Sequence, residues 1–293
     1  NHTLSSHSGA VKIVCWNESY RKLTTVDENG LIIVWMTQQD HWYEEMINNR
    51  NKSRVTDLKW SPDGTRICIV YEDGAVIVGS VEGNRLWGKE LKHNLALIEW
   101  SPDSKIILFS TPSGEVKAYD NNGSFLFDLK IYCLQDIVGP TKLYNPEMKL
   151  AAVQWYAGSK MYTDETPPGL LIAYENGRIQ LMRNDKDDVP IIMDSYMSIS
   201  TVRWNPNGTI FAVGGYRFET RDNKQVKQGV VQFFNNQGYH LRALTVQQCD
   251  RIAALAWEGT GLKVSMAAGS SIYYANIKPD YKWGYMNTAH TVV

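Results

Sequence analysis

Hydrophobic and polar residues alternate along short segments of this chain, and tight turns separate these segments. In one example, the alternating run Val55–Lys59 leads to Trp60 and then to the turn Ser61–Gly64. Successive side chains of a β-strand point to opposite faces of a sheet, so alternation over a few residues is typical of a strand. No segment has the periodicity of an amphipathic helix. We therefore expect a protein built from short strands.

The same unit recurs around six tryptophans, each of which follows a strand-like run. The six lie 40 to 55 residues apart: Trp16, Trp60, Trp100, Trp155, Trp204 and Trp257. Turns rich in Pro, Asp, Asn and Gly follow several of them, and these residue types favour the backbone angles of tight turns. WD-type propellers repeat about every 40–45 residues, so the longer spacings indicate loop insertions.

Further strands are expected within each unit. A second strand follows the turn, as at Arg66–Val70, and a Gly-containing hairpin turn then opens a third, as at Ala75–Val78. A fourth, edge strand is predicted in most units, at Trp42–Met46, Arg85–Trp87, Phe125–Phe127, Ile191–Met193 and His240–Leu244. Four short strands per unit predict an all-β fold, a WD-repeat β-propeller.

The six units indicate about six blades within a single propeller domain, residues 1–293. Because the chain begins in the strand leading to Trp16 and has no initiator Met, we expect a fragment of a longer protein. We favour a seven-bladed ring whose first blade is incomplete or missing; the alternative is a six-bladed ring closed by its own ends. Residues 277–293 offer one further strand, and residues 157–169 and 216–228 are expected to be surface-loop insertions.

Composition supports thin sheets and places the protein on the cytosolic side of membranes. The chain has 10 Trp and 16 Tyr but only 7 Phe, and the polar tip of Trp and Tyr suits strands whose ends lie near water. The start lacks a signal peptide, and no apolar run reaches the roughly 18 residues of a membrane span. The four cysteines are scattered and are expected to be reduced, structural thiols: Cys15, Cys68, Cys133 and Cys249.

Little in the sequence indicates chemistry. The formal net charge of −1 argues against a nucleic-acid partner, which usually meets a strongly basic face. There is no phosphate-binding loop or hydrolase motif, and the histidines never fall at metal-ligand spacing. We therefore expect no catalytic residues, no cofactor and no metal. His7 is expected to bond within its own blade.

One polar, basic segment, Asn48–Arg54, follows a pair of aromatic residues. It is read either as a solvated connection between blades or as a basic edge that meets an acidic partner or lipid headgroups. Each cation near an anionic membrane contributes only about 1 kcal/mol, so such an edge would orient a protein already held by partners. The candidate partner or membrane contacts are Trp42, Tyr43, Arg50, Lys52 and Arg54.

Long stretches of the chain resemble one family of propellers. These stretches are Asp27–Met36, Trp42–Ser53, Ile67–Val81, Trp87–Leu91 and Ile272–Tyr285. They are similar, in order, to the amino-terminal propeller of the intraflagellar transport protein 121 family, WD-repeat subunits of intraflagellar transport complex A. The WD dipeptide itself is absent, since Met36 follows Trp35.

The resemblance implies a non-enzymatic scaffold, the first propeller of a protein with a second propeller and a helical-repeat tail. It implies roles in retrograde ciliary transport, entry of membrane proteins into cilia and cilium assembly. The implied partners are other complex A subunits and ciliary membrane-protein cargo or adaptors, in the cytoplasm and the cilium (axoneme and basal body). Two alternatives remain: a vesicle-coat-type propeller that recognises cargo sorting motifs, and a propeller enzyme with titratable residues converging on its central channel.

Overall fold

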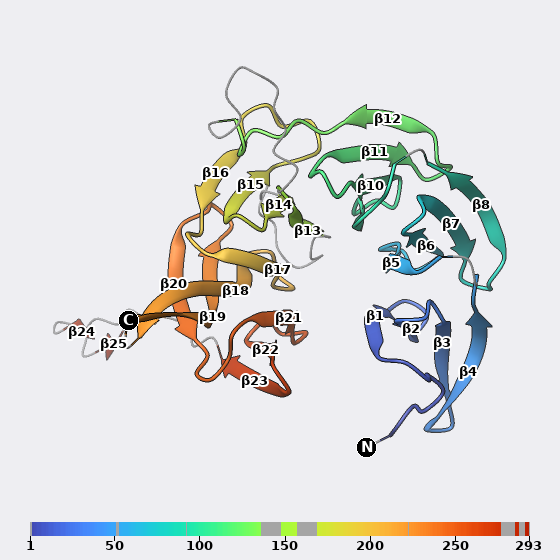
Figure 1. Cartoon of the computed structure of the whole chain (residues 1–293), viewed down its shortest axis with the longest axis horizontal. Coiled ribbons are helices and arrows are strands. Elements are labelled where there is room, and N and C mark those ends of the chain that lie inside the picture. Colours follow the sequence, from blue (N-terminus) through green and yellow to red (C-terminus); the bar gives the residue numbers. More distant parts are fainter. Residues whose placement is uncertain are drawn as a thin grey trace.

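The computed structural model confirms the all-β expectation. It describes residues 2–50, 53–91, 93–135, 148–156, 169–221, 223–276, 285–286 and 291–292, and the regular structure in these ranges is β-strand throughout. The strands form successive antiparallel sheets arranged around an axis, as blades of a propeller (Figure 1). Within each blade, strands that follow one another in sequence lie side by side.

Six blades are present in the described residues, five with four strands and the sixth with three. In chain order the blades are β1 (Val11–Asn17), β2 (Lys22–Asp27), β3 (Ile32–Gln38), β4 (His41–Asn48); β5 (Val55–Trp60), β6 (Arg66–Tyr71), β7 (Ala75–Ser80), β8 (Arg85–Glu90); β9 (Ile98–Trp100), β10 (Ile106–Ser110), β11 (Val116–Asp120), β12 (Phe125–Asp128); β13 (Leu150–Trp155), β14 (Leu170–Tyr174), β15 (Arg178–Met182), β16 (Ile191–Asp194); β17 (Ser198–Trp204), β18 (Ile210–Arg221), β19 (Lys224–Asn235), β20 (His240–Thr245); and β21 (Ile252–Trp257), β22 (Lys263–Ala268), β23 (Ser271–Asn276).

Near the end of the chain, β24 (Tyr285–Met286) and β25 (Thr291–Val292) form a separate two-stranded sheet. They pair with each other and not with β23, so they do not add the further blade strand that the sequence offered. The insertion expected at 157–169 falls, except for Gly169, outside the described residues.

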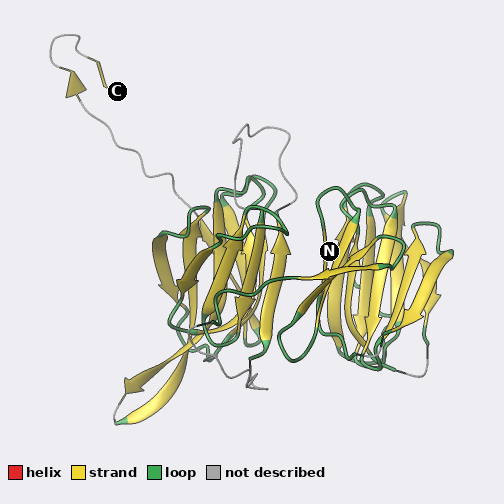
Figure 2. Ribbon diagram, turned by 90° about the horizontal axis from the view of Figure 1, so that it is seen from above, coloured by secondary structure: helices red, strands yellow, loops and turns green. Residues whose placement is uncertain are grey.

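The expected loop at 216–228 is wrong, because this region is a β-hairpin. β18 and β19 each have 12 residues and pair continuously as far as Arg221 and Lys224. Tyr216 and Phe218 alternate with charged residues, which is a strand pattern, and Asn223 takes the positive φ of 61° that a tight two-residue turn requires. The hairpin projects beyond one side of the disc (Figure 2).

The hydrophobic core is divided among the interfaces between blades. On β6, Ile67 and Ile69 pack toward the first blade, whereas Cys68 and Val70 pack toward the third. The two-residue period of a strand thus lets one middle strand bury both of its faces. Such a buried cluster lies at each of the five interfaces between consecutive blades in the described chain. Face-to-face packing of blades is therefore what stabilises the fold.

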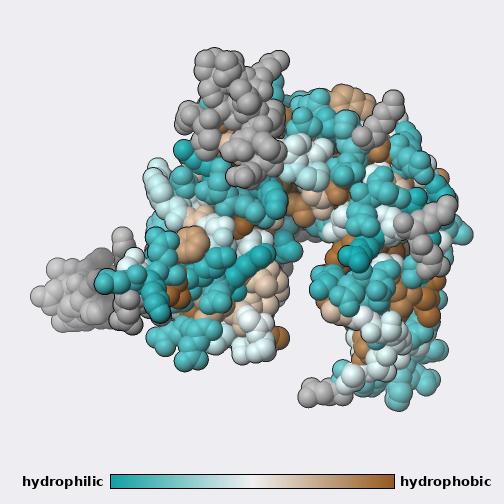
Figure 3. Space-filling model, in the orientation of Figure 1, coloured by the Kyte–Doolittle hydropathy of each residue, from teal (hydrophilic) through white to brown (hydrophobic). Residues whose placement is uncertain are grey.

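The array of blades is open between the first and the sixth, as the ribbon and the space-filling view both show (Figures 1 and 3). Three of the tryptophans that mark the repeats (the landmark tryptophans) donate their indole N–H to the preceding blade: Trp60 to Thr24 Oγ1, Trp100 to the Lys59 carbonyl and Trp257 to the Arg203 carbonyl. Trp16 has no such neighbour, and it is 46% exposed whereas Trp100 is 2% exposed.

His7 bonds within the first blade, as predicted. Its Nε2 lies 2.6 Å from Thr25 Oγ1, and its Nδ1 lies 3.3 Å from Asp27 Oδ2. Trp35 donates its indole N–H to the same Thr25 oxygen at 2.8 Å. The four side chains tie the entry segment to β2 and β3, so His7 has a structural role. All four cysteines are free thiols, and three of them are buried.

Candidate functional site on the propeller rim

The structure separates the predicted contact residues into two groups. Trp42 and Tyr43 lie at the start of β4, the outer strand of the first blade, and Tyr43 is exposed. Arg50 and Arg54 lie beyond the other end of that strand. At about 3.3 Å per residue, the two groups are roughly 25 Å apart. Lys52 lies outside the described residues.

Arg50 is already engaged by the second blade. Its Nη1 donates to both carboxylate oxygens of Asp73, at 2.9 and 2.8 Å. The guanidinium also lies over the ring of Tyr71, 5.0 Å from its centroid, and its Nη2 is 3.9 Å from Glu90 Oε1. Only 19% of the Arg50 side chain is exposed. Arg50 therefore fastens the connection between the first two blades, and its charge is largely satisfied inside the chain.

The electrostatics of Asp73 agree with this contact. Desolvation alone would raise the pKa of Asp73, but hydrogen bonds from Arg50 and from the Ala75 backbone N–H hold that pKa below its ordinary value. A carboxylate with a lowered pKa keeps its charge well into acid, so the pair persists at physiological pH.

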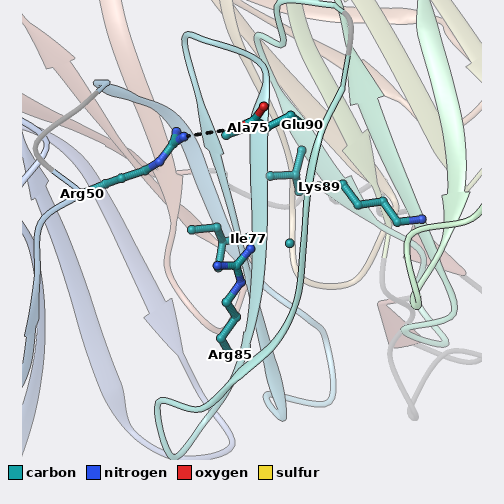
Figure 4. A pocket seen from close by; sticks show the side chains of 8 residues that line it. Arg50, Ala75, Ile77, Arg85, Lys89 and Glu90 are labelled. Atoms are coloured by element: carbon teal, nitrogen blue, oxygen red, sulfur yellow. Dashed lines mark ion pairs between the residues drawn. The ribbon is translucent and has the colours of Figure 1, made fainter.

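A groove of about 520 Å³ lies beside Arg50, against β7 and β8 (Figure 4). The groove is lined by three cationic side chains, those of Arg50, Arg85 and Lys89, and by one carboxylate, that of Glu90. Lys89 points away from the others and donates to the Gly123 carbonyl of the third blade (Figure 4).

Arg85 is the cation that the sequence reasoning missed. It opens β8, and its guanidinium occupies the space that a side chain at position 88 would fill, because Gly88 has none. In the described part of the chain, Arg85 has no ion pair or side-chain hydrogen bond. A planar guanidinium with free donors suits a carboxylate or phosphate group. The sequence signal that could have found it is its place at the start of the predicted edge strand Arg85–Trp87, because edge strands face solvent.

Charged side chains also meet beside the axis, between the inner strands β5 and β9. Lys59 forms an ion pair with Glu99, and Asp57 accepts a hydrogen bond from the Ile98 backbone N–H at 2.8 Å. Lys59 and Glu99 each come directly before a landmark tryptophan, a signal that sequence reasoning overlooked. Burial raises the pKa of the Asp57 and Glu99 carboxyl groups, and the positive charge of Lys59 opposes that rise.

This axial cluster resembles a structural ion pair more than a reaction centre. Cys15 lies near this cluster and carries a thiol, which can act as a nucleophile, but burial raises the pKa of that thiol. The thiolate is the reactive form, so a raised pKa makes Cys15 a poor nucleophile at neutral pH. Lys59 is held by Glu99, and both carboxylates interact with the neighbouring blade. The contacts thus fasten the second blade to the third.

Within the described ranges, no three His, Cys, Asp or Glu side chains gather where they could hold a metal ion. In those ranges there is also no helix with the length and apolar character that crossing a bilayer demands.

Sequence relatives agree with the blade architecture. A family model described as WDR35/TULP4 N-terminal, for a β-propeller, matches residues 1–278. Human WD repeat-containing protein 35 is 48% identical over 294 residues, which is 100% of this chain and 24% of that protein. Human Tubby-related protein 4 is 29% identical over 298 residues, 95% of this chain and 19% of that protein. The chain thus spans about a quarter or less of the length of these relatives.

Solved structures with little sequence similarity share the fold. The crystal structure of Chaetomium thermophilum Raptor matches 94% of this chain and 24% of that chain, with a TM-score of 0.70 at 14% identity. A chain of the mitotic checkpoint complex matches 95% of this chain, with a TM-score of 0.65 at 14% identity. At this identity the likeness concerns the arrangement of strands alone.

Proposed function

Because this chain belongs to the WDR35/TULP4 N-terminal propeller family, we propose that it is the scaffold propeller of an intraflagellar transport complex A subunit. Its roles would be retrograde ciliary transport, entry of membrane proteins into cilia and cilium assembly. It acts through protein–protein contacts and without catalysis, in the cytoplasm and in the cilium at the axoneme and basal body. The observation that carries the proposal is the similarity to WD repeat-containing protein 35 along the whole chain.

The physical form of the molecule supports a scaffold. Blades that bury both faces against their neighbours hold their outer strands and turns in fixed positions. A rigid surface loses little conformational entropy when a partner binds, so several partners can bind at once at low cost. Complex A subunits and ciliary membrane-protein cargo or adaptors are the partners that this role requires.

We also propose that the rim of the first two blades takes part in these contacts. Tyr43 and Arg54 are exposed, and Arg85 offers free donors in the groove, whereas Arg50 is held by Asp73. With so few unpaired cations, a membrane contact at this rim would be weak and would act beside protein contacts.

Rescue in ciliated cells that lack their own copy tests the proposal. Full-length protein should restore return of transport particles from the ciliary tip, and full-length protein without residues 1–293 should leave them accumulated there. Full rescue by the truncated protein would contradict the proposal. Binding of the chain to coat sorting peptides, without binding to complex A subunits, would instead favour the vesicle-coat alternative.

A further inference from the structure

The hairpin of the fifth blade extends past its neighbouring strands and forms an arm, of which residues 217–221 and 223–227 are described. Pairing of β17 with β18 ends at Ser198 and Tyr216, and pairing of β19 with β20 ends at Val230 and Thr245. Gly229 still bonds to Cys249 and Val246, but beyond it the ladder of the described residues joins β18 and β19 only to each other, from Phe218 and Lys227 to Arg221 and Lys224. Both edges of the arm therefore carry unpaired backbone groups, and an unpaired edge is a template for another strand.

The outer edge of the arm is the β19 edge, on the side where β20 pairs with β19. The neighbouring residue Gly229 shows which backbone groups of this edge point outward. Its N–H donates to the Cys249 carbonyl at 2.6 Å, and its carbonyl accepts from the Val246 N–H at 3.0 Å, both away from β18. Backbone direction alternates with a period of two along an antiparallel strand. Gln225 and Lys227 therefore direct their backbone N–H and C=O groups away from β18, to the side of β19 on which β20 pairs farther along the strand.

Charge at this edge is positive and unpaired. Lys224 and Lys227 have no carboxylate within ion-pair distance in the described chain. Lys227 Nζ instead lies 4.4 Å from the ring centroid of Tyr216. Arg217, on the other strand, is paired with Glu219 at 2.9 Å. The two lysines are thus the cations that a ligand at the outer edge would meet.

Apolar side chains flank the same edge. Phe218 lies across from Lys227 in the ladder and is 57% exposed, and Val226 is 37% exposed. Cross-strand partners share a face, so Phe218 and Lys227 form one face of the arm while Val226 lies on the other. An added strand would find an apolar contact on each face.

We propose that the outer edge of the arm, Lys224–Lys227, binds an acidic, extended segment of a partner protein as an added β-strand. The outward groups of Gln225 and Lys227 supply main-chain hydrogen bonds, and the two lysines select acidic side chains. Aligned donors and acceptors beside β20 favour a polypeptide over a lipid surface, because lipid tails cannot satisfy them. The site rests on the geometry of the arm and is independent of the ciliary role.

Two proline variants test the strand addition. Gln225→Pro removes an outward N–H without removing a ladder bond, and Thr220→Pro does the same on the opposite edge, across from Gln225. The probe is a fluorescent synthetic peptide of alternating glutamate and valine, with a lysine–valine peptide as the charge control. Fluorescence anisotropy with the full chain should show binding of the acidic peptide only. Gln225→Pro should weaken that binding about tenfold or more, since it loses hydrogen bonds and fit, and Thr220→Pro should change it little.

Charge is tested separately with Lys224→Glu/Lys227→Glu, which should abolish peptide binding while the melting temperature stays that of the unchanged chain. The proposal is overturned if the unchanged chain does not bind the acidic peptide, or if Gln225→Pro binds it as tightly as Thr220→Pro. It is also overturned if phosphatidylserine-containing vesicles bind in place of the peptide and are lost with the lysine variant, because the arm would then be a membrane contact.

Discussion

A landmark tryptophan contributes to stability only where a neighbouring blade covers it. Trp60 is 9% exposed, belongs to the cluster between the first two blades, and donates to Thr24 Oγ1 at 3.0 Å. Trp16 has the same place in its own repeat but lies half-exposed at the opening. Both end the first strand of a blade, so we expect the difference in their contribution to stability to come from packing.

Trp60→Ala should lower the free energy of unfolding by about 3–5 kcal/mol, because it removes a large buried side chain and leaves a cavity. Trp16→Ala should cost no more than about 1 kcal/mol, as for partly exposed residues. Urea denaturation of both variants measures the difference. Equal losses would contradict the assignment of the core to the blade interfaces.

The buried Asp187 predicts that the stability of the folded protein depends on pH. Its side chain is 1% exposed and accepts hydrogen bonds from the Arg183 guanidinium, the Arg183 N–H and the Val189 N–H. The hydrogen bonds from Arg183 hold the pKa of Asp187 well below its ordinary value. A lowered folded-state pKa stabilises the protein above the ordinary pKa, and that stabilisation is lost as pH falls toward the folded pKa.

Asp187→Asn should therefore cost about 1–3 kcal/mol at neutral pH. The gap between variant and unchanged chain should shrink as pH drops below about 4, where an unfolded-state Asp takes up its proton. Denaturation at a series of pH values follows both proteins. A gap that stays constant down to the lowest accessible pH would show that the Asp187 charge has no part in it.

At the scale of elements, one glycine lets β17 and β18 approach at the base of the arm. A Cβ at position 215 would lie 1.9 Å from the Ser198 carbonyl oxygen, beside an irregularity in the pairing of β17 with β18. Backbone rather than a flexible side chain is in the way. Gly259, in contrast, has nothing within 4 Å of such a Cβ.

Gly215→Ala should destabilise the chain by about 1–3 kcal/mol, the usual cost of overpacking. Gly259→Ala should stay within about 0.5 kcal/mol of the unchanged chain. Thermal melts give the comparison. If Gly215→Ala has the same melting temperature as the Gly259→Ala control, the close approach of β17 and β18 is not present in solution.

Strands were predictable where their signals are local. The hairpin turn before Ala75 and the alternation before Trp60 correctly gave β7 and β5. The arm is not predicted, because its charged residues favour a loop, although Tyr216 and Phe218 alternate with them as in a strand. The contact of Arg50 with Asp73 joins residues 23 positions apart on two blades, and no local pattern encodes that distance.

At the scale of the whole molecule, the opening between the first and sixth blades has apolar walls. Val14 and Trp16 are exposed on one side, and Ile272 and Tyr274 on the other. In the other five blades, the residues that correspond to Val14, two positions before the landmark tryptophan, are buried: Leu58, Ile98, Val153, Val202 and Leu255. We propose that a seventh blade occupies the opening in the full-length protein, which is the ring favoured from the sequence.

Hydroxyl-radical footprinting with mass spectrometry tests this closure. Trp16 should be labelled readily in the 293-residue chain and protected in the full-length protein, because a seventh blade would cover it. Trp100, buried already, should be protected in both and serves as the control. Equal labelling of Trp16 in the two proteins would mean that the ring stays open.

The scaffold role itself is tested most directly by purifying tagged full-length protein from ciliated cells and quantifying what accompanies it by mass spectrometry. Complex A subunits should co-purify with the unchanged protein and with Gly259→Ala. Those that dock on this propeller should be lost with Trp60→Ala, which weakens the blade interface. Absence of complex A subunits from the unchanged protein, or coat subunits in their place, would contradict the account.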